Sequence, residues 1–203
     1  MNTAATAPLK AKLLLVDDDR LVLSTLANGL TKAGYRVRTA ESAEDAEMLL
    51  ANGNGDTPDL AILDIRMSGQ DGLFLARRLQ ELDHIPFMML SAYVDQHLID
   101  QASQLGALGY LVKPLDIPQL LPSIEAALSR ANELHSLRES RLQLQAALNA
   151  ERDISVAIGI TMAQSRLERH AAFELLRKTA RSQRRKLSDL AAEIIRSTVP
   201  TKT

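Results

Sequence analysis

The sequence contains no cysteine, few aromatic residues (3%) and no long apolar run. The absence of cysteine excludes disulfide bonds and thiolate metal sites, and it is typical of an intracellular protein. No stretch approaches the roughly 18 apolar residues that a membrane-spanning helix needs, and residues 1–9 lack the apolar core of a signal peptide. We therefore expect a soluble, cytoplasmic protein that makes no contact with a membrane.

Histidine is scarce as well, and the four histidines lie too far apart to match a metal-ligand spacing. The 203 residues suffice for one domain of ordinary size and a small second one. The net charge of -1 hides an uneven distribution, because residues 152–203 hold 11 Lys and Arg against 5 Asp and Glu, whereas residues 1–151 hold 13 against 20. An acidic N-terminal part and a basic C-terminal part indicate two modules, of which the second could bind a polyanion.

Apolar runs and amphipathic stretches alternate five times over residues 11–130. Regular alternation of this kind predicts an α/β fold with a doubly wound, five-stranded parallel sheet. Ser42, Gly34 and Asp116 are expected to cap the neighbouring helices, and residues 52–58, rich in Gly, Asn and Asp, are expected to form a loop. The predicted strands are 13–16, 36–40, 60–63, 87–90 and 109–112, and the predicted helices are 21–33, 43–52, 73–82, 96–105 and one that begins near residue 117.

Four of these apolar runs are followed at once by a polar side chain. Asp17 and Asp18 follow the first run, Asp64 the second, Ser91 the third and Lys113 the fourth. Taken singly, each has a plain structural explanation, such as a helix cap, but the carboxyl ends of parallel strands converge on one edge, where ligands bind. Three carboxylates repel one another unless a hard cation such as Mg²⁺ lies between them. A hydroxyl and an ammonium beside them predict a phosphoryl-accepting site.

At these residues the chain resembles the bacterial response-regulator receiver domain. The resemblance implies that Asp64 accepts a phosphoryl group from a sensor histidine kinase, and that the protein is a switch rather than an enzyme. The family usually has proline where this sequence has Ser68. The matching segments are Leu-Val-Asp17-Asp18-Asp19, Leu-Asp64-Ile-Arg-Met-Ser-Gly69-Gln-Asp71-Gly72, Leu-Ser91-Ala92 and Tyr110-Leu-Val-Lys113-Pro114.

The resemblance also implies a role for each of the other residues of the site. Ser91 and Lys113 would bind the phosphoryl oxygens, Ser91 and Tyr110 would change position on activation, and the Lys113–Pro114 bond would be cis. The Mg²⁺ ligands would be Asp17, Asp18, Asp64 and the main-chain carbonyl of Arg66.

The last of the five helices is predicted to continue far beyond the sheet, to about residue 152. Four leucines fall at heptad spacing along it, with Arg141 at one seam position: Leu134, Leu137, Leu144 and Leu148. This spacing predicts a short coiled coil that joins two copies of the chain in a homodimer. An amphipathic linker that packs against its own receiver remains the alternative.

The last fifty residues contain three helical patterns, over 154–162, 167–179 and 189–195, with Ser188 as the expected cap of the third. The segments that carry a resemblance are Arg152-Asp-Ile154, Ala157-Ile-Gly159-Ile160-Thr-Met162, Ala171-Ala-Phe173, Leu176-Arg177, Ala180 and Lys186-Leu187-Ser-Asp-Leu190-Ala191. With these segments, residues 152–197 resemble the ANTAR domain, the three-helix RNA-binding output of transcription antitermination regulators. Two departures concern the RNA contact: Ile158 replaces the usual lysine, and the glycine common between the first two helices is absent from 163–166.

We therefore expect a receiver over 11–130, a coiled-coil linker over 131–151 and an ANTAR domain over 152–198. The resemblance implies binding to hairpins in nascent RNA and transcription antitermination. Two alternatives stay open: a DNA-binding helix-turn-helix that uses residues 187–195, and a regulator that acts only through protein contacts. Phe173 is the one aromatic residue in the region, so base stacking on a platform is excluded. The expected contacts to RNA are cationic: Arg177, Arg181, Arg184, Arg185 and Lys186.

Overall fold

The computed structural model describes residues 10–52 and 56–198. The N-terminal segment 1–9 and part of the loop expected over 52–58 lie outside these residues. The chain divides between His135 and Ser136 into two compact units. None of the helices in the described ranges is both long and apolar enough to cross a membrane.

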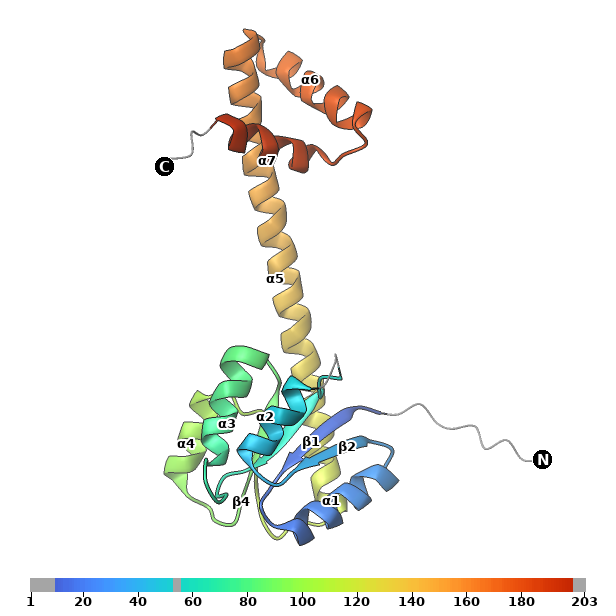
Figure 1. Cartoon of the computed structure of the whole chain (residues 1–203), viewed down its shortest axis with the longest axis vertical. Helices are drawn as coiled ribbons and strands as arrows, with labels where there is room; N and C mark the ends of the chain where they lie inside the picture. The colour runs from blue at the N-terminus through green and yellow to red at the C-terminus, as the bar shows by residue number, and fades with distance from the viewer. Residues whose placement is uncertain (1–9, 53–55, 199–203) are drawn as a thin grey trace, which may run out of the picture. The chain divides into compact units, whose positions relative to one another are not determined.

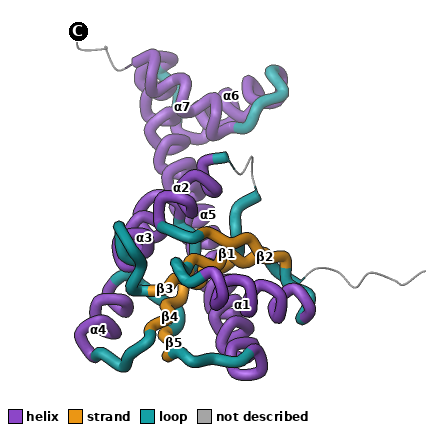
Figure 2. The backbone as a smooth tube through the Cα atoms, turned by 60° about the horizontal axis from the view of Figure 1, so that its bottom comes forward, coloured by secondary structure: helices purple, strands orange, loops and turns teal. Residues whose placement is uncertain are grey.

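The first unit is built on a five-stranded sheet in the order β2-β1-β3-β4-β5, and all four strand pairs are parallel. Figure 2 shows the strands side by side between two layers of helices. The prediction of a doubly wound parallel sheet is therefore confirmed. The strands are β1 (Lys12–Val16), β2 (Arg36–Ala40), β3 (Leu60–Asp64), β4 (Phe87–Ser91) and β5 (Tyr110–Val112).

Side chains of successive strand residues point to opposite faces of the sheet and build two separate cores. In β1, Leu13 and Leu15 lie in the core under α1 and α5, whereas Leu14 and Val16 lie in the core under α2, α3 and α4. Both faces of the sheet are therefore covered (Figure 1). The helices are α1 (Arg20–Lys32), α2 (Ala43–Ala51), α3 (Gly72–Arg78) with a π-helical turn (Leu79–Asp83), α4 (Gln96–Gln104) and α5 (Ile117–Ser165).

The helix ends carry the capping residues that the sequence indicates. The side chain of Ser42 accepts a hydrogen bond from the N–H of Asp45, and Asp116 accepts one from the N–H of Gln119 at the start of α5. Gly34, just after α1, has a φ of +96°, a conformation that glycine adopts without the strain a Cβ brings. Local sequence therefore sets where these helices begin and end.

The second unit is a small helical bundle formed by the end of α5 with α6 (Arg169–Ser182) and α7 (Leu187–Thr198). Its core is made of short and medium apolar side chains, among them Ala157, Ile158, Leu176 and Leu190. Ile158 is only 7% exposed, so it fills the core and is not available to a ligand on the surface. The side chain that replaces the expected lysine therefore stabilises the bundle.

Both turns of this bundle place an arginine in the left-handed conformation. Arg166 follows α5 with a φ of +51° and Arg184 follows α6 with a φ of +53°. The N–H of Leu167 donates to the carbonyl of Met162, and that of Arg185 to Ala180, as in the Schellman ending that glycine usually completes. In the turn between α5 and α6, Arg166 thus takes the left-handed position for which glycine is the usual residue.

Candidate functional site

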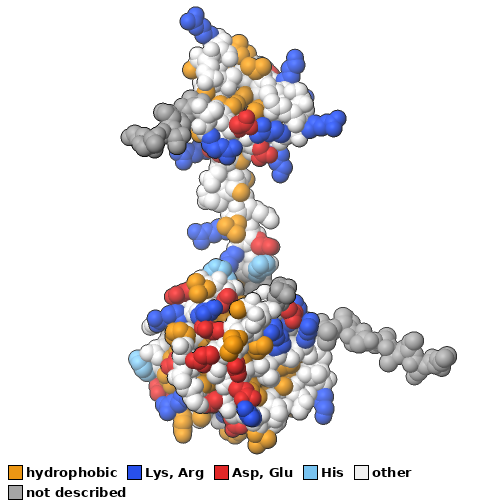
Figure 3. Space-filling view, viewed as in Figure 1, with side chains coloured by type: hydrophobic (Ala, Val, Ile, Leu, Met, Phe, Trp, Pro, Cys, Tyr) orange, Lys and Arg blue, Asp and Glu red, His pale blue; other side chains and the backbone are white. Residues whose placement is uncertain are grey.

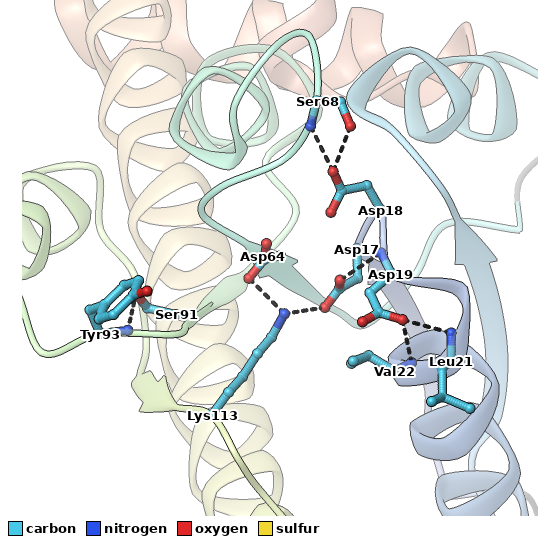
Figure 4. Close-up of polar contacts among 10 residues, drawn as sticks. All are labelled: Asp17, Asp18, Asp19, Leu21, Val22, Asp64, Ser68, Ser91, Tyr93 and Lys113. Carbon is cyan, nitrogen blue, oxygen red and sulfur yellow. Dashed lines mark hydrogen bonds and ion pairs between the residues drawn. The ribbon is translucent and has the colours of Figure 1, made fainter.

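The carboxyl ends of the strands bring four of the predicted site residues to one edge of the sheet (Figure 4). Asp17 directly follows β1, and Asp64 and Ser91 are the last residues of β3 and β4. The register pairs Asp64 with Leu90, one residue before Ser91. Lys113 directly follows β5, and the Lys113–Pro114 peptide bond is cis, as predicted. Asp17 and Asp64 are only 2% and 6% exposed, so their charges lie in a largely water-excluded site.

Lys113 joins the two buried carboxylates. Its Nζ lies 2.5 Å from an oxygen of Asp17 and 2.8 Å from an oxygen of Asp64. Burial raises the pKa of Asp64 above its ordinary value; the contact with Lys113 opposes this rise, and the charges of Asp17 and Asp18 add to it. Burial lowers the pKa of Lys113, but hydrogen bonds and charges from Asp17 and Asp64 outweigh it, so its pKa is raised. The ammonium therefore stays charged beside Asp64.

Asp18 is exposed at the rim of the same edge and is held by Ser68. One oxygen of Asp18 accepts hydrogen bonds from the N–H of Ser68 at 2.8 Å and from its hydroxyl at 2.6 Å. These two bonds, the hydroxyl first, lower the pKa of Asp18. Asp19 has a different role, since its side chain caps α1 through the N–H groups of Leu21 and Val22.

The three carboxylates form a set that suits a hard cation. Asp17, Asp18 and Asp64 each offer one ligand oxygen, and these atoms all lie within 4.8 Å of one another. Oxygen ligands of this charge are what Mg²⁺ takes in proteins, with water at its remaining positions. Because Lys113 supplies a single positive charge, the cluster keeps an excess of negative charge that a divalent cation would balance.

Ser91 lies at the neighbouring strand end but is not joined to the carboxylates. Its hydroxyl oxygen accepts a hydrogen bond from the N–H of Tyr93 at 3.2 Å. The Tyr110 hydroxyl donates to the carbonyl of Tyr93 at 3.1 Å, and the guanidinium of Arg66 lies 5.6 Å from the centre of the Tyr93 ring. The two predicted switch residues, Ser91 and Tyr110, therefore share one partner, Tyr93.

Gly72 fixes how closely the helix α3 approaches the site. A Cβ at this position would lie 1.9 Å from the carbonyl oxygen of Asp64 and 2.9 Å from its carbonyl carbon. The N–H of Gly72 donates to the carbonyl of Ile65 at 3.0 Å. The start of α3 is therefore pressed against the backbone that carries Asp64.

The basic residues of the second unit differ in how they are engaged. Arg185 forms an ion pair of 2.5 Å with Glu193, which connects the turn to α7, and Arg177 lies 3.3 Å from Glu174 on its own helix. Arg181, Arg184 and Lys186 are exposed. Figure 3 shows Lys and Arg side chains projecting from this unit into solvent. Lys178, which sequence reasoning missed, lines a surface hollow with Leu175, Arg177 and Arg181.

The four leucines of the predicted coiled coil are exposed along α5. Leu134, Leu137, Leu144 and Leu148 are exposed by 44%, 60%, 64% and 54%. Leu142, outside the heptad positions, is exposed by 70%. A row of large apolar side chains on one helix is thus left in contact with water in the single chain.

Two other residues of the site were not found from sequence. The sequence marks Ser68 only as a departure from the receiver pattern, and it indicates no role for Tyr93. The signal for Ser68 is its place four residues before the start of α3, in the loop that follows Asp64. The sequence around Tyr93 carries no comparable signal, since its backbone provides both of its hydrogen bonds.

Comparisons with known proteins agree with this arrangement. The model of the response regulator receiver domain matches residues 13–125, and that of the ANTAR domain matches residues 142–195. The transcriptional regulatory protein PdtaR of Mycobacterium tuberculosis is 28% identical over 200 residues, which cover 98% of this chain and 96% of that protein. The transcriptional regulatory protein AfsQ1 of Streptomyces coelicolor is 37% identical over 118 residues, 58% of this chain and 51% of that protein.

Among solved structures, a two-component response regulator from Clostridium difficile superposes with a TM-score of 0.56 at 26% identity. The match covers 61% of this chain and 99% of the other. The receiver model alone covers more than half of the chain, and the second model matches the helical bundle. The chain therefore belongs to the response regulators that combine a receiver domain with a C-terminal ANTAR domain.

Proposed function

We propose that this protein is a phosphorylation-controlled regulator that binds hairpins in nascent RNA and promotes transcription antitermination. The observation that carries the receiver half is the joint contact of Lys113 with Asp17 and Asp64 at the strand ends. The match of residues 142–195 to the ANTAR domain supports the output half. In this proposal the receiver comprises residues 11–130, the linker 131–151 and the output domain 152–198.

Asp64 is the proposed phosphoacceptor. One of its carboxylate oxygens forms a bond to phosphorus while the bond from phosphorus to the imidazole nitrogen of a sensor histidine kinase breaks, and that nitrogen keeps the electron pair. Such a transfer needs neutralisation of charge more than covalent help. Lys113, already beside Asp64, supplies one positive charge, and the hydroxyl of Ser91 is the expected second contact to the phosphoryl oxygens.

The proposed metal site consists of Asp17, Asp18, Asp64 and the main-chain carbonyl of Arg66. A bound Mg²⁺ would neutralise charge on the phosphoryl oxygens. The distances among the three carboxylates support this assignment. Lys113 and the bound cation would together lower the repulsion between an anionic phosphoryl donor and the three carboxylates.

Ser91 and Tyr110 are the proposed switch residues. A phosphoryl group on Asp64 would accept a hydrogen bond from the Ser91 hydroxyl and draw this hydroxyl away from the N–H of Tyr93, from which its oxygen now accepts. Because Tyr93 also accepts a hydrogen bond from Tyr110, a shift of Ser91 frees both tyrosines to move. A small change at the acceptor can in this way bias two arrangements of the surface around β4 and β5.

Dimerisation is proposed to run through the exposed leucines of α5, because two such helices would remove these side chains from water. RNA contact is proposed for Arg177, Arg181, Arg184, Arg185 and Lys186, among which Arg185 has to exchange its pairing with Glu193 for a phosphate. Proteins read RNA sequence mostly in splayed loop bases, with cations on the backbone. We place this activity in the cytoplasm.

The test of the output is to crosslink the protein to nucleic acid in cells and to sequence what is recovered. RNA hairpins upstream of terminators support the proposal. Recovery of double-stranded DNA sites would instead favour a helix-turn-helix output through residues 187–195, and recovery of no nucleic acid would favour a regulator that acts through protein contacts. The receiver is tested by phosphate incorporation, which Asp64→Ala is expected to abolish.

A further inference from the structure

Ser68 makes two hydrogen bonds to one oxygen of a proposed metal ligand. Its N–H and its hydroxyl donate to Oδ2 of Asp18 at 2.8 Å and 2.6 Å (Figure 4). Both distances are in the short range of hydrogen bonds to a charged carboxylate. An exposed carboxylate in the loop after a strand would otherwise sample several rotamers, and these contacts select one of them.

The selected rotamer is compatible with cation binding. Figure 4 shows that the other oxygen of Asp18 faces toward Asp17 and Asp64. With Ser68 in contact, one oxygen from each of the three carboxylates still lies within 4.8 Å of the others. The hydrogen bonds therefore hold Asp18 in the cluster without occupying the oxygen that faces it.

The loop that carries Ser68 is anchored on both sides. Ile65 and Met67, immediately before it, are buried in the core under α2, α3 and α4. After it, the N–H of Gly72 donates to the carbonyl of Ile65 at 3.0 Å, and the side chain of Asp71 caps α3. Ser68 is thus fixed by contacts that involve none of the carboxylates of the cluster.

We propose that Ser68 is a positioning residue for the divalent cation: it holds Asp18 in its ligating orientation before the ion arrives. The proposal rests on the function proposed above, which makes Asp18 a ligand. Because folding already orders the Asp18 side chain, cation binding does not have to compensate for the conformational entropy lost in ordering it. Two donors on Oδ2 also draw negative charge away from the oxygen that faces Asp64, so the three carboxylates repel one another less before the cation binds.

The experiment compares the Mg²⁺ affinity of the unmodified chain with that of four variants by calorimetric titration at fixed ionic strength. Ser68→Ala removes the hydroxyl donor, and Ser68→Pro removes the hydroxyl and the N–H, since proline has no backbone donor. Ser68→Thr keeps both donors, and Ser103→Ala, an exposed site near the end of α4, is the matched control. Thermal melting of each chain without Mg²⁺ shows that the fold is retained.

Ser68→Ala is expected to weaken Mg²⁺ binding about tenfold, the lower end of what loss of a partner to a metal ligand costs. Ser68→Pro is expected to weaken it further, while Ser68→Thr and Ser103→Ala keep the original affinity. An unchanged affinity in Ser68→Ala overturns the proposal, and a tighter one shows that Ser68 competes with the cation. If Ser68→Pro does not fold, the contrast between alanine and threonine decides. Absence of Mg²⁺ binding by the unmodified chain refutes the metal site itself, and the role of Ser68 with it.

Discussion

Replacing Gly72 by alanine is expected to impair phosphoryl acceptance through steric displacement alone. The added Cβ would lie 1.9 Å from the carbonyl oxygen of Asp64, about 1.5 Å inside the 3.4 Å at which ordinary contact begins. The atom in the way belongs to backbone in a buried strand, so either α3 or the end of β3 has to shift by about 1 Å. Overpacking of this kind costs roughly 1–3 kcal/mol of stability. A 1 Å displacement of a reacting group costs about a hundredfold in rate.

The assay is the rate of phosphate incorporation from a small acyl phosphate in the presence of Mg²⁺, together with the melting temperature. Gly159→Ala is the matched control, because a Cβ there meets no atom within 4 Å on the exposed side of α5. That variant should gain about 1 kcal/mol from helix propensity and keep its phosphorylation rate. A Gly72→Ala chain that melts and accepts phosphate like the original would refute the close approach of α3 to Asp64.

Three further predictions concern charge, assembly and the output. Burial raises the pKa of Asp64 in the folded state above its ordinary value of 3.8. Ionisation of Asp64 therefore destabilises the fold: the stability is complete below pH 3.8 and is lost as the pH rises through the raised pKa. Asp64→Asn should therefore raise the melting temperature at pH 7 without divalent cation, and the gain should shrink toward pH 3.8; a gain independent of pH would contradict this. Leu144→Asp combined with Leu148→Asp should give a monomer in sedimentation, since charges at a buried seam are costly, and a persistent dimer would place the interface elsewhere. Arg184→Gly should stabilise the bundle by about 1 kcal/mol by relieving the left-handed arginine, yet weaken RNA binding and flatten its log–log salt dependence by roughly 0.7; unchanged RNA affinity would remove Arg184 from the interface.

The sheet and its polar edge could be predicted because they depend on local patterns. Runs such as 60–63 are apolar on both faces, as strands covered by two helical layers must be, and the chain order places Asp17, Asp64 and Lys113 after them. The caps at Ser42 and Asp116 follow from side chains that bond a backbone N–H only three residues away. The strands β3 and β4 extend one residue beyond prediction, so that Asp64 and Ser91 are the last residues of the strands.

The features that could not be predicted depend on contacts between distant residues or on small differences in backbone geometry. The bond between Ser68 and Asp18 joins two loops fifty positions apart in sequence, and no spacing rule indicates it. Ile158 is in the core because α6 and α7 pack over it. The prediction that Ser188 caps α7 was wrong, since the helix begins at Leu187 and the carbonyl of Lys186 already accepts its first helical hydrogen bonds. The π-helical turn after Arg78 likewise leaves no mark on the apolar pattern.

The most direct test of the proposed function is the affinity of the full chain for an RNA hairpin with and without a phosphoryl group on Asp64. Titrations would use the chain treated with a small acyl phosphate and Mg²⁺, the untreated chain, and Asp64→Asn treated in the same way, with double-stranded DNA as competitor. We predict that treatment tightens RNA binding by the original chain, leaves Asp64→Asn unchanged, and that DNA does not compete. Equal affinity in all three samples, or a preference for the duplex DNA, would contradict RNA binding that is controlled by phosphorylation of Asp64.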